Sequence, residues 1–151
     1  MAMTENIQIR PVGEDERPAW EPLWAGYLAF YKATLAPGAS DVAWARFHDP
    51  NEPIFLLGAY VDGRLTGIVH YLFHRSTWTP GNYCYLQDLF VARDLRGGGI
   101  GRKLIEAVYD KARSLGCSRV HWLTHETNTD AMLLYDRIAD RSGFVQYRKI
   151  F

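Results

Sequence analysis

The stretch LQDLFVARDLRGGGIGRKL, residues 86–104, decides how this chain is organised. It begins with apolar and aromatic residues typical of a central strand, and it ends where an amphipathic helix begins. Between the two stands a glycine-rich segment from Arg96 to Gly101. Glycines between a strand and a helix let several backbone N–H groups converge on an anion at the helix N-terminus. The stretch therefore predicts a phosphate-binding loop.

Two common phosphate motifs do not fit this loop. A dinucleotide-binding G-x-G-x-x-G pattern started at Gly97 meets Arg102 where glycine is required, and one started at Gly99 meets Leu104. A Walker loop ends in Gly-Lys-Ser/Thr, whereas Gly101 is followed by Arg102 and a lysine. A flexible turn before a helix remains the alternative interpretation of the glycines alone.

The elements predicted around this loop follow from periodicity and turn residues. Residues 7–10 alternate as a short strand, and residues 14–31 space their apolar side chains as an amphipathic helix does, with an end near Pro37-Gly38. Ser40 is a suitable N-cap for a second short helix. Asp62-Gly63 is a favoured two-residue turn and predicts an antiparallel hairpin between strands 54–61 and 65–74. The remaining predictions are strand 83–91, helix 101–115 closed by Gly116, strand 119–124, a helix from Asn128 closed by Gly143, and a last strand 144–151.

The order β-α-α-β-β-β-α-β-α-β predicts an α/β fold of the α+β mixed-sheet kind, in which helices flank a central, mostly antiparallel sheet. The chain has 151 residues, of which 48% are hydrophobic and 23% charged. A chain of this length buries roughly 70% of its extended surface on folding. No repeat, low-complexity segment or linker interrupts it, so we expect residues 1–151 to form a single domain.

The charges exclude some classes of partner. Lys and Arg number 17, as do Asp and Glu, so no global field draws the chain to nucleic acid or to an anionic membrane. Residues 1–75 carry nine acids and six bases, and residues 76–151 carry eight acids and eleven bases, so an anionic cofactor would favour the second half. Two cysteines, no leader and no apolar stretch of membrane length predict a soluble protein of a reducing compartment, the cytoplasm.

The glycine loop also fits a longer pattern. R-x-x-G-x-G at Arg96, Gly99 and Gly101 follows the strand 86–91 and precedes N-x-x-A-x-x-L-Y at residues 128–135. This combination resembles the acyl-CoA-binding core of the GNAT superfamily of N-acetyltransferases. Leu-x-Asp-Leu-Phe-Val, Arg-Gly-x-Gly-Ile-Gly and Trp122-x-Thr124 look like its polyamine and yeast histone/polyamine acetyltransferase branch. The likeness is close from Tyr83 to the end and looser before it.

The resemblance implies that acetyl-CoA is the co-substrate. Its pyrophosphate would bind the loop's backbone N–H groups, aided by the helix dipole and two nearby cations. Its pantetheine arm would pair with the central strand as a surrogate strand beside a β-bulge, where an amide N–H would polarise the thioester carbonyl. Asn128 is either an N-cap, a partner of the cofactor, or both. The residues implied in acetyl-CoA binding are Leu89, Phe90, Val91, Arg96, Gly97, Gly98, Gly99, Ile100, Gly101, Arg102, Lys103, Asn128, Ala131 and Tyr135.

Acetylation of an amine needs a proton donor for the departing thiolate and a base for the amine. Tyr135 matches the family's tyrosine acid, although its helix stripe also suits a plain core tyrosine. Polyamine-type relatives carry Leu-Glu-Asp in the central strand, but here Gln87 replaces the Glu and an amide takes no proton at neutral pH. Asp88, Glu126 or ordered water remain candidates for the base.

The histidines and cysteines predict neither a metal site nor a cysteine nucleophile. The pairs His70/His74 and His121/His125 lie four residues apart on predicted strands, where that spacing spans ~13 Å and cannot place two ligands on one zinc ion. We therefore expect no metal site. Cys84 and Cys117 have no recognisable neighbouring base, which favours direct attack on acetyl-CoA in a ternary complex over a covalent thiol intermediate.

The expected acceptor is a small cationic primary amine, polyamine or amino-acid-like, because an acidic first half and aromatic side chains suit a cation. The candidate lining residues are Tyr27, Tyr31, Trp78, Gln87 and Asp88. A protein-lysine acetyltransferase and a non-catalytic acyl-CoA-binding sensor are the alternatives. The resemblance further implies a homodimer with the strand 144–151 near its interface.

Overall fold

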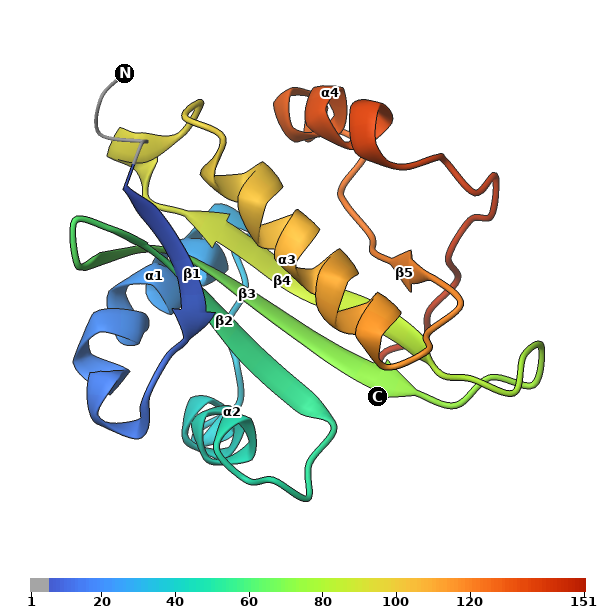
Figure 1. Ribbon diagram of the computed structural model, residues 1–151, viewed down its shortest axis with the longest axis horizontal. Coiled ribbons are helices and arrows are strands. Elements are labelled where there is room, and N and C mark those ends of the chain that lie inside the picture. Colours follow the sequence, from blue (N-terminus) through green and yellow to red (C-terminus); the bar gives the residue numbers. More distant parts are fainter. Residues whose placement is uncertain (1–5) are drawn as a thin grey trace.

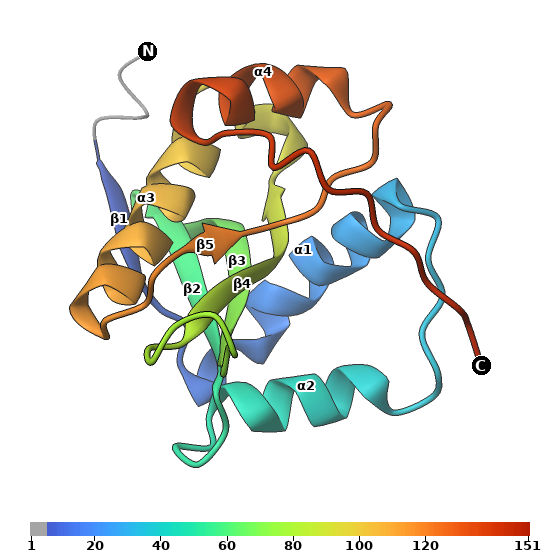
Figure 2. The same cartoon turned by 90° about the vertical axis from the view of Figure 1, so that its right-hand side faces the viewer.

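The computed structural model describes residues 6–151 and has a five-stranded mixed sheet between two layers of helices (Figures 1 and 2). Neighbouring strands are antiparallel except for β4 and β5, which are parallel. The predicted mixed-sheet α/β fold is confirmed. The strands, in spatial order, are β1 (Ile7–Pro11), β2 (Ile54–Val61), β3 (Arg64–His74), β4 (Tyr83–Val91) and β5 (Val120–His121); the helices are α1 (Arg17–Phe30), α2 (Ala39–Phe47), α3 (Ile100–Ser114) and α4 (Thr129–Ile138).

The sheet separates two hydrophobic cores. Side chains of α3 pack on one face against Val69, Tyr71 and Leu86, with α4 beside them. On the other face α1 and α2 bury two tryptophans, Trp20 and Trp44, against the same strands. Alternation along each strand decides which side chains enter which core. Within residues 6–151 no helix is long and apolar enough to cross a membrane.

The predicted hairpin is confirmed, because β2 and β3 pair on either side of Asp62-Gly63. Both turn residues have positive φ, 50° and 81°, as a tight turn that matches the twist of the strands requires. The first helix ends earlier than expected, at Phe30 instead of near Pro37-Gly38. Lys32 takes a left-handed φ of 52° and the Ala33 N–H donates to the Leu28 carbonyl, which closes the helix without a glycine.

Ser40 does not cap α2, so that prediction is wrong. The N-cap position belongs to Gly38, whose φ is +82°. The Ser40 hydroxyl instead accepts a hydrogen bond from the Trp24 indole N–H at 3.0 Å. This bond ties α1 to α2 on the face of the sheet that carries the two tryptophans.

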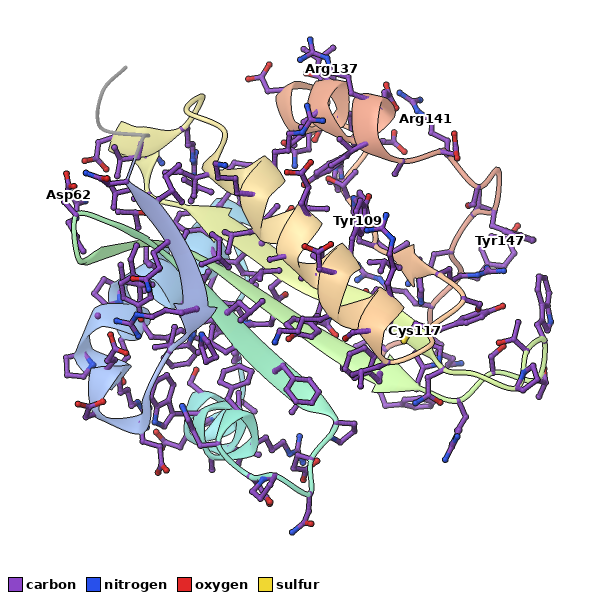
Figure 3. All side chains as sticks on the ribbon, in the orientation of Figure 1. Asp62, Tyr109, Cys117, Arg137, Arg141 and Tyr147 are labelled. Carbon is purple, nitrogen blue, oxygen red and sulfur yellow. The ribbon has the colours of Figure 1, made fainter. Side chains whose placement is uncertain are left out.

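The predicted last strand, residues 144–151, is also wrong for the single chain. The segment after α4 runs without regular structure from the α4 side of the sheet toward the α1–α2 side (Figure 2), and Gly143 lies beyond the helix it was expected to close. Tyr147 is 93% exposed and points away from the sheet (Figure 3). A strand needs a partner edge, and β5, predicted as 119–124, pairs only at two residues.

Candidate active site

The glycine loop joins β4 to α3 through a 3-10 turn, η3 (Arg93–Leu95). Gly97 and Gly99 have φ of 87° and 85°, and a Cβ added at either would meet nothing within 4 Å. In the described chain, no backbone N–H from Arg96 to Arg102 donates to another residue; the first such bond runs from the Lys103 N–H to the Gly99 carbonyl. Free amides around open space at the start of a 15-residue helix suit a phosphate.

The side chain of Arg96 braces this loop. Its Nε–H donates to the Val91 carbonyl at 3.0 Å, and its guanidinium carbon lies 4.9 Å from the centre of the Phe90 ring. The cations at the helix start are therefore Arg102 and Lys103, of which Arg102 also pairs with Glu106 at 3.2 Å. Together they leave the loop electropositive.

Strand β4 is open along one edge just before the loop. It pairs with β5 only at Cys84 and Tyr85, so its continuation through Leu89–Val91 has no partner strand on that side within the described chain. The pairing with β3 shifts so that His70 faces Asp88 and the next pair joins Tyr71 to Leu86, which leaves Gln87 as the extra residue of a β-bulge. The bulge expected in this strand is confirmed.

Tyr135 lies on α4 with its ring 5.3 Å from that of Trp122, centre to centre. Burial, with a smaller contribution from Tyr31, raises the pKa of the Tyr135 phenol to about 12. The phenol therefore keeps its proton at neutral pH and can act as an acid. Core packing against Trp122 and a role as proton donor are compatible for this side chain.

The residues just before and within α4 differ from their predictions in detail. Asn128 occupies the N-cap position but makes no capping bond with its side chain; its amide N–H donates to the Thr124 hydroxyl at 3.1 Å instead. Ala131 is half-buried in the same helix. Glu126 is exposed in the turn before α4, whereas Asp88 has only 13% of its side chain exposed.

Asp88 lies under a group of aromatic side chains from α1. One carboxylate oxygen accepts a hydrogen bond from the His70 Nδ1–H at 2.9 Å. Burial first, and then the Asp88 carboxylate, raise the pKa of the Tyr27 phenol above its ordinary value. The ring centres of Tyr27 and Tyr31 are 4.9 Å apart. Tyr31 in turn contributes to raising the pKa of the Tyr135 phenol. The structure thus brings four predicted site residues together along one wall of the site: Tyr27, Tyr31, Asp88 and Tyr135.

Two other predicted acceptor residues are exposed. Trp78 is 69% exposed in the β3–β4 loop, where the Arg119 guanidinium lies over its ring. Gln87 is exposed on the bulge. A cavity of about 560 Å³ opens between β5, α4 and the C-terminal segment, with Tyr135 and His121 among its lining residues.

Sequence reasoning missed the partners of Asp88. His70 is almost fully buried, and its Nε2 accepts a hydrogen bond at 3.1 Å from the indole N–H of Trp20, fifty residues earlier. A histidine in the apolar run of β3 is the only local signal of this contact. A second cross-strand pair, His74 and His121, has its Nε2 atoms 3.4 Å apart. Among the side chains the structure describes, no three metal-ligating groups come together.

The cysteines do not present a nucleophile. Burial raises the pKa of the Cys84 thiol to about 12, and burial also raises the pKa of Cys117. A thiol with so high a pKa forms almost no thiolate at neutral pH. An anion cradle, a buried carboxylate and a protonated phenol together suit transfer of an acyl group from an anionic thioester to an amine.

Comparisons with known proteins agree with this chemistry. The model of the acetyltransferase (GNAT) family matches residues 13–139. D-amino-acid N-acetyltransferase HPA3 of Saccharomyces cerevisiae is 34% identical over 97% of this chain and 92% of its own. Thialysine N-epsilon-acetyltransferase of Sus scrofa is 38% identical over 51% of this chain and 45% of its own. The crystal structure of ribosomal-protein-alanine N-acetyltransferase from Brucella melitensis has a TM-score of 0.79 and 26% identity, covering 96% of this chain and 99% of that one.

Proposed function

The chain belongs to the GNAT family of acetyltransferases and is an N-acetyltransferase, and we propose that it acetylates the primary amine of a small, cationic, amino-acid-like acceptor with acetyl-CoA. The observation that carries this proposal is the buried Asp88 carboxylate, which no Lys or Arg of the described chain neutralises. A carboxylate with 13% of its side chain exposed needs a cation, and the ammonium group of the acceptor supplies one.

The residues present fit acetyl-CoA. Free amides of the loop from Arg96 to Gly101 would hold its pyrophosphate, with Arg102 and Lys103 adding positive charge. The open edge of β4 at Leu89–Val91 would pair with the amides of its pantetheine arm. Asn128 and Ala131 would flank that arm from α4. Bound there, acetyl-CoA supplies an acetyl group activated as a thioester.

Two side chains carry the proton transfers in this proposal. Asp88 receives the acceptor as an ammonium ion and takes its proton, directly or through water, so that the nitrogen can attack the carbonyl carbon. The new N–C bond forms as the C–S bond breaks, and the Tyr135 phenol gives its proton to the departing sulfur. The acetylated nitrogen loses its second proton, which returns through water to the Tyr135 phenolate. The raised pKa of the Cys84 thiol supports direct attack without a cysteine intermediate. Glu126, exposed in its turn, is the weaker candidate for the base.

The proposed acceptor class draws on two relatives, a D-amino-acid N-acetyltransferase and thialysine N-epsilon-acetyltransferases. Both names refer to acetylation of small amines. The aromatic rings of Tyr27 and Tyr31 beside Asp88 suit a cation of this size. The sequence offers Gln87 in place of the Glu of polyamine-type enzymes, which favours the amino-acid-like acceptor over a polyamine.

A thiol-release assay with acetyl-CoA tests the proposal. The amine panel holds D- and L-amino acids, thialysine, polyamines, aminoglycosides and a lysine peptide, and calorimetry measures acetyl-CoA binding in parallel. We expect CoA release with amino-acid-like amines. Release with the peptide alone would establish a protein-lysine acetyltransferase instead, and acetyl-CoA binding without release on any amine would favour a sensor; both results overturn the proposed acceptor class.

We also propose a homodimer in the cytoplasm, with residues 144–151 near its interface. Phe144, Val145, Tyr147 and Ile150 are each at least 76% exposed, and such apolar side chains suit contact with a second copy. Light scattering of the purified protein should give twice the mass of one chain, and removal of residues 143–151 should shift it to the monomer. A wild-type monomer would contradict the proposal.

A further inference from the structure

The net charge of the Asp88–His70 pair depends on whether His70 is protonated, and the structure fixes which ring nitrogen of neutral His70 carries the proton. The Trp20 indole N–H can only donate, and it points at His70 Nε2 at 3.1 Å. Nε2 must therefore accept, and the single proton of the neutral ring lies on Nδ1. That proton faces the Asp88 carboxylate at 2.9 Å.

A charged His70 would not suit this arrangement. Protonation at Nε2 would bring two N–H donors face to face between His70 and Trp20 and remove a buried hydrogen bond. The ring is also enclosed by aromatic side chains, with Phe47 at 4.6 Å and Trp24 at 5.0 Å between ring centres.

We infer that Trp20 and His70 are positioning residues of the acceptor site: the Trp20 N–H holds His70 as the neutral Nδ1–H tautomer, and His70 orients Asp88 without neutralising it. This inference rests on the proposed function, because it assigns Asp88 to the acceptor's ammonium group. A charged His70 would form an internal ion pair with Asp88, and the site would lose its attraction for a cation.

The other groups that face this pair leave the assignment unchanged. Asp88 is near the phenols of Tyr27 on α1 and Tyr85 on β4. His70 is in contact with the rings of Trp24 on α1 and Phe47 on α2. The carboxylate contributes to raising the pKa values of both tyrosines, so they are neutral hydroxyls at working pH. Among these groups, His70 is the one that contacts the Asp88 carboxylate through a ring N–H.

Replacement of Trp20 by Phe tests the tautomer, because it keeps a ring but removes the N–H. Trp24→Phe is the matched control: Trp24 also contacts His70, but its N–H goes to Ser40. Without the Trp20 donor, Nε2 is free to take a proton as the pH falls. We expect the KM of Trp20→Phe for a cationic amine to rise about tenfold relative to Trp24→Phe between about pH 7.5 and pH 5.5, while the acetyl-CoA affinity stays unchanged.

A second pair of variants tests the orientation of Asp88. The side-chain amide of His70→Asn can donate to the carboxylate from nearly the place of Nδ1, whereas His70→Leu cannot donate. We expect His70→Leu to lose about 10- to 100-fold in kcat/KM for the amine, the worth of a hydrogen bond to a charged group, and His70→Asn to recover most of it. Melting curves check that each variant folds.

Long-range ¹H–¹⁵N spectra of the imidazoles give a readout that needs no activity. The signal absent from His70→Asn belongs to His70, and in the wild type it should show a proton on Nδ1 alone at neutral pH. A charged ring or a proton on Nε2 would overturn the inference even if the protein acetylates amines. Matching pH profiles of Trp20→Phe and Trp24→Phe would overturn it too. A wild type inactive on every amine would instead overturn the proposed function.

Discussion

The two sides of the site are built from different material. On the proposed acetyl-CoA side, the loop from Arg96 to Gly101 presents backbone N–H groups, and the glycines act by leaving space. On the proposed acceptor side, a carboxylate is held by side chains of α1 and β3 that are up to fifty residues apart in sequence. The first surface is local in the chain, and the second exists only after the helices have packed on the sheet.

The two sides should therefore be sensitive to different substitutions. A backbone surface tolerates changes of side chain but not of backbone conformation or charge at its glycines. A side-chain network fails when one member loses its hydrogen-bonding atom, even if the volume is kept. Substitutions that keep shape and remove a single property therefore separate the two sides.

The largest effect is expected at the carboxylate itself. Asp88→Asn keeps the volume but removes the charge and the base, and we expect kcat/KM for the amine to fall about 10²- to 10⁴-fold. Acetyl-CoA affinity, measured by calorimetry, should stay within about twofold, because the loop's amides are untouched. Glu126→Gln is the control, with activity near that of the wild type. If Glu126→Gln had the greater loss, the base would belong to the turn before α4.

A large effect is next expected at the loop. Gly99→Asp places a carboxylate among the amides proposed to bind phosphate and forces a side chain into a φ of 85°, so acetyl-CoA affinity should fall about 100-fold. Gly38→Asp is a close control, because Gly38 is also an N-cap glycine with a φ of 82° and open space, but begins α2. Calorimetry on both variants compares them. Equal losses would assign the effect to backbone strain and remove the phosphate site.

The same contrast explains what the sequence predicted. The hairpin at Asp62-Gly63 and the loop at Gly97–Gly101 follow from residues that are adjacent in the chain, and the structure has both turns where the sequence placed them. The Trp20–His70 contact has no such signature, since neither residue predicts the other. Ser40 shows that prediction can fail even for local features. A serine before a helix suggests an N-cap, but in the packed chain its hydroxyl accepts a hydrogen bond from Trp24.

The C-terminal segment shows a second limit. The apolar and aromatic residues of 144–151 predict a strand, but within the described single chain this segment pairs with no strand of the sheet. The predicted strand is therefore absent from the single chain. The residue pattern indicates that a segment can form a strand, but whether it does depends on a partner strand in the packed chain.

Tyr135 is proposed to act between the two sides, on the departing sulfur, and we expect its replacement to lower kcat less than the substitutions above. A thiol's pKa is about 8.5, so the thiolate leaves readily without help, and Tyr135→Phe should lower kcat only about tenfold. Because burial raises the phenol's pKa to about 12, the acid form persists as pH rises. The ratio of wild-type to Tyr135→Phe kcat should therefore stay constant up to about pH 10. A ratio that fell between neutral pH and that limit would mean that the phenol loses its proton far below its expected pKa.

The smallest effect is expected at the start of α1, which brings Trp20 and Tyr27 to the sheet. Glu16 accepts hydrogen bonds from Arg10, the Gly13 N–H and the Tyr60 hydroxyl. These partners, led by Arg10, lower the pKa of Glu16 from 4.5 to about 2. A carboxyl whose pKa is lowered by folding stabilises the native state above its unfolded pKa, and this contribution is lost as the pH falls toward the folded pKa.

Glu16→Gln should therefore lower the free energy of unfolding by about 1 kcal/mol at neutral pH, a modest value because solvent screens the partly exposed Arg10. The difference from the wild type should shrink between about pH 4.5 and about pH 2, as urea unfolding at several pH values would show. Glu21→Gln, in the exposed ion pair with Arg17, is the control and should cost less. If kcat/KM for the amine fell in Glu16→Gln while acetyl-CoA affinity held, the acceptor side alone would depend on how firmly α1 is anchored.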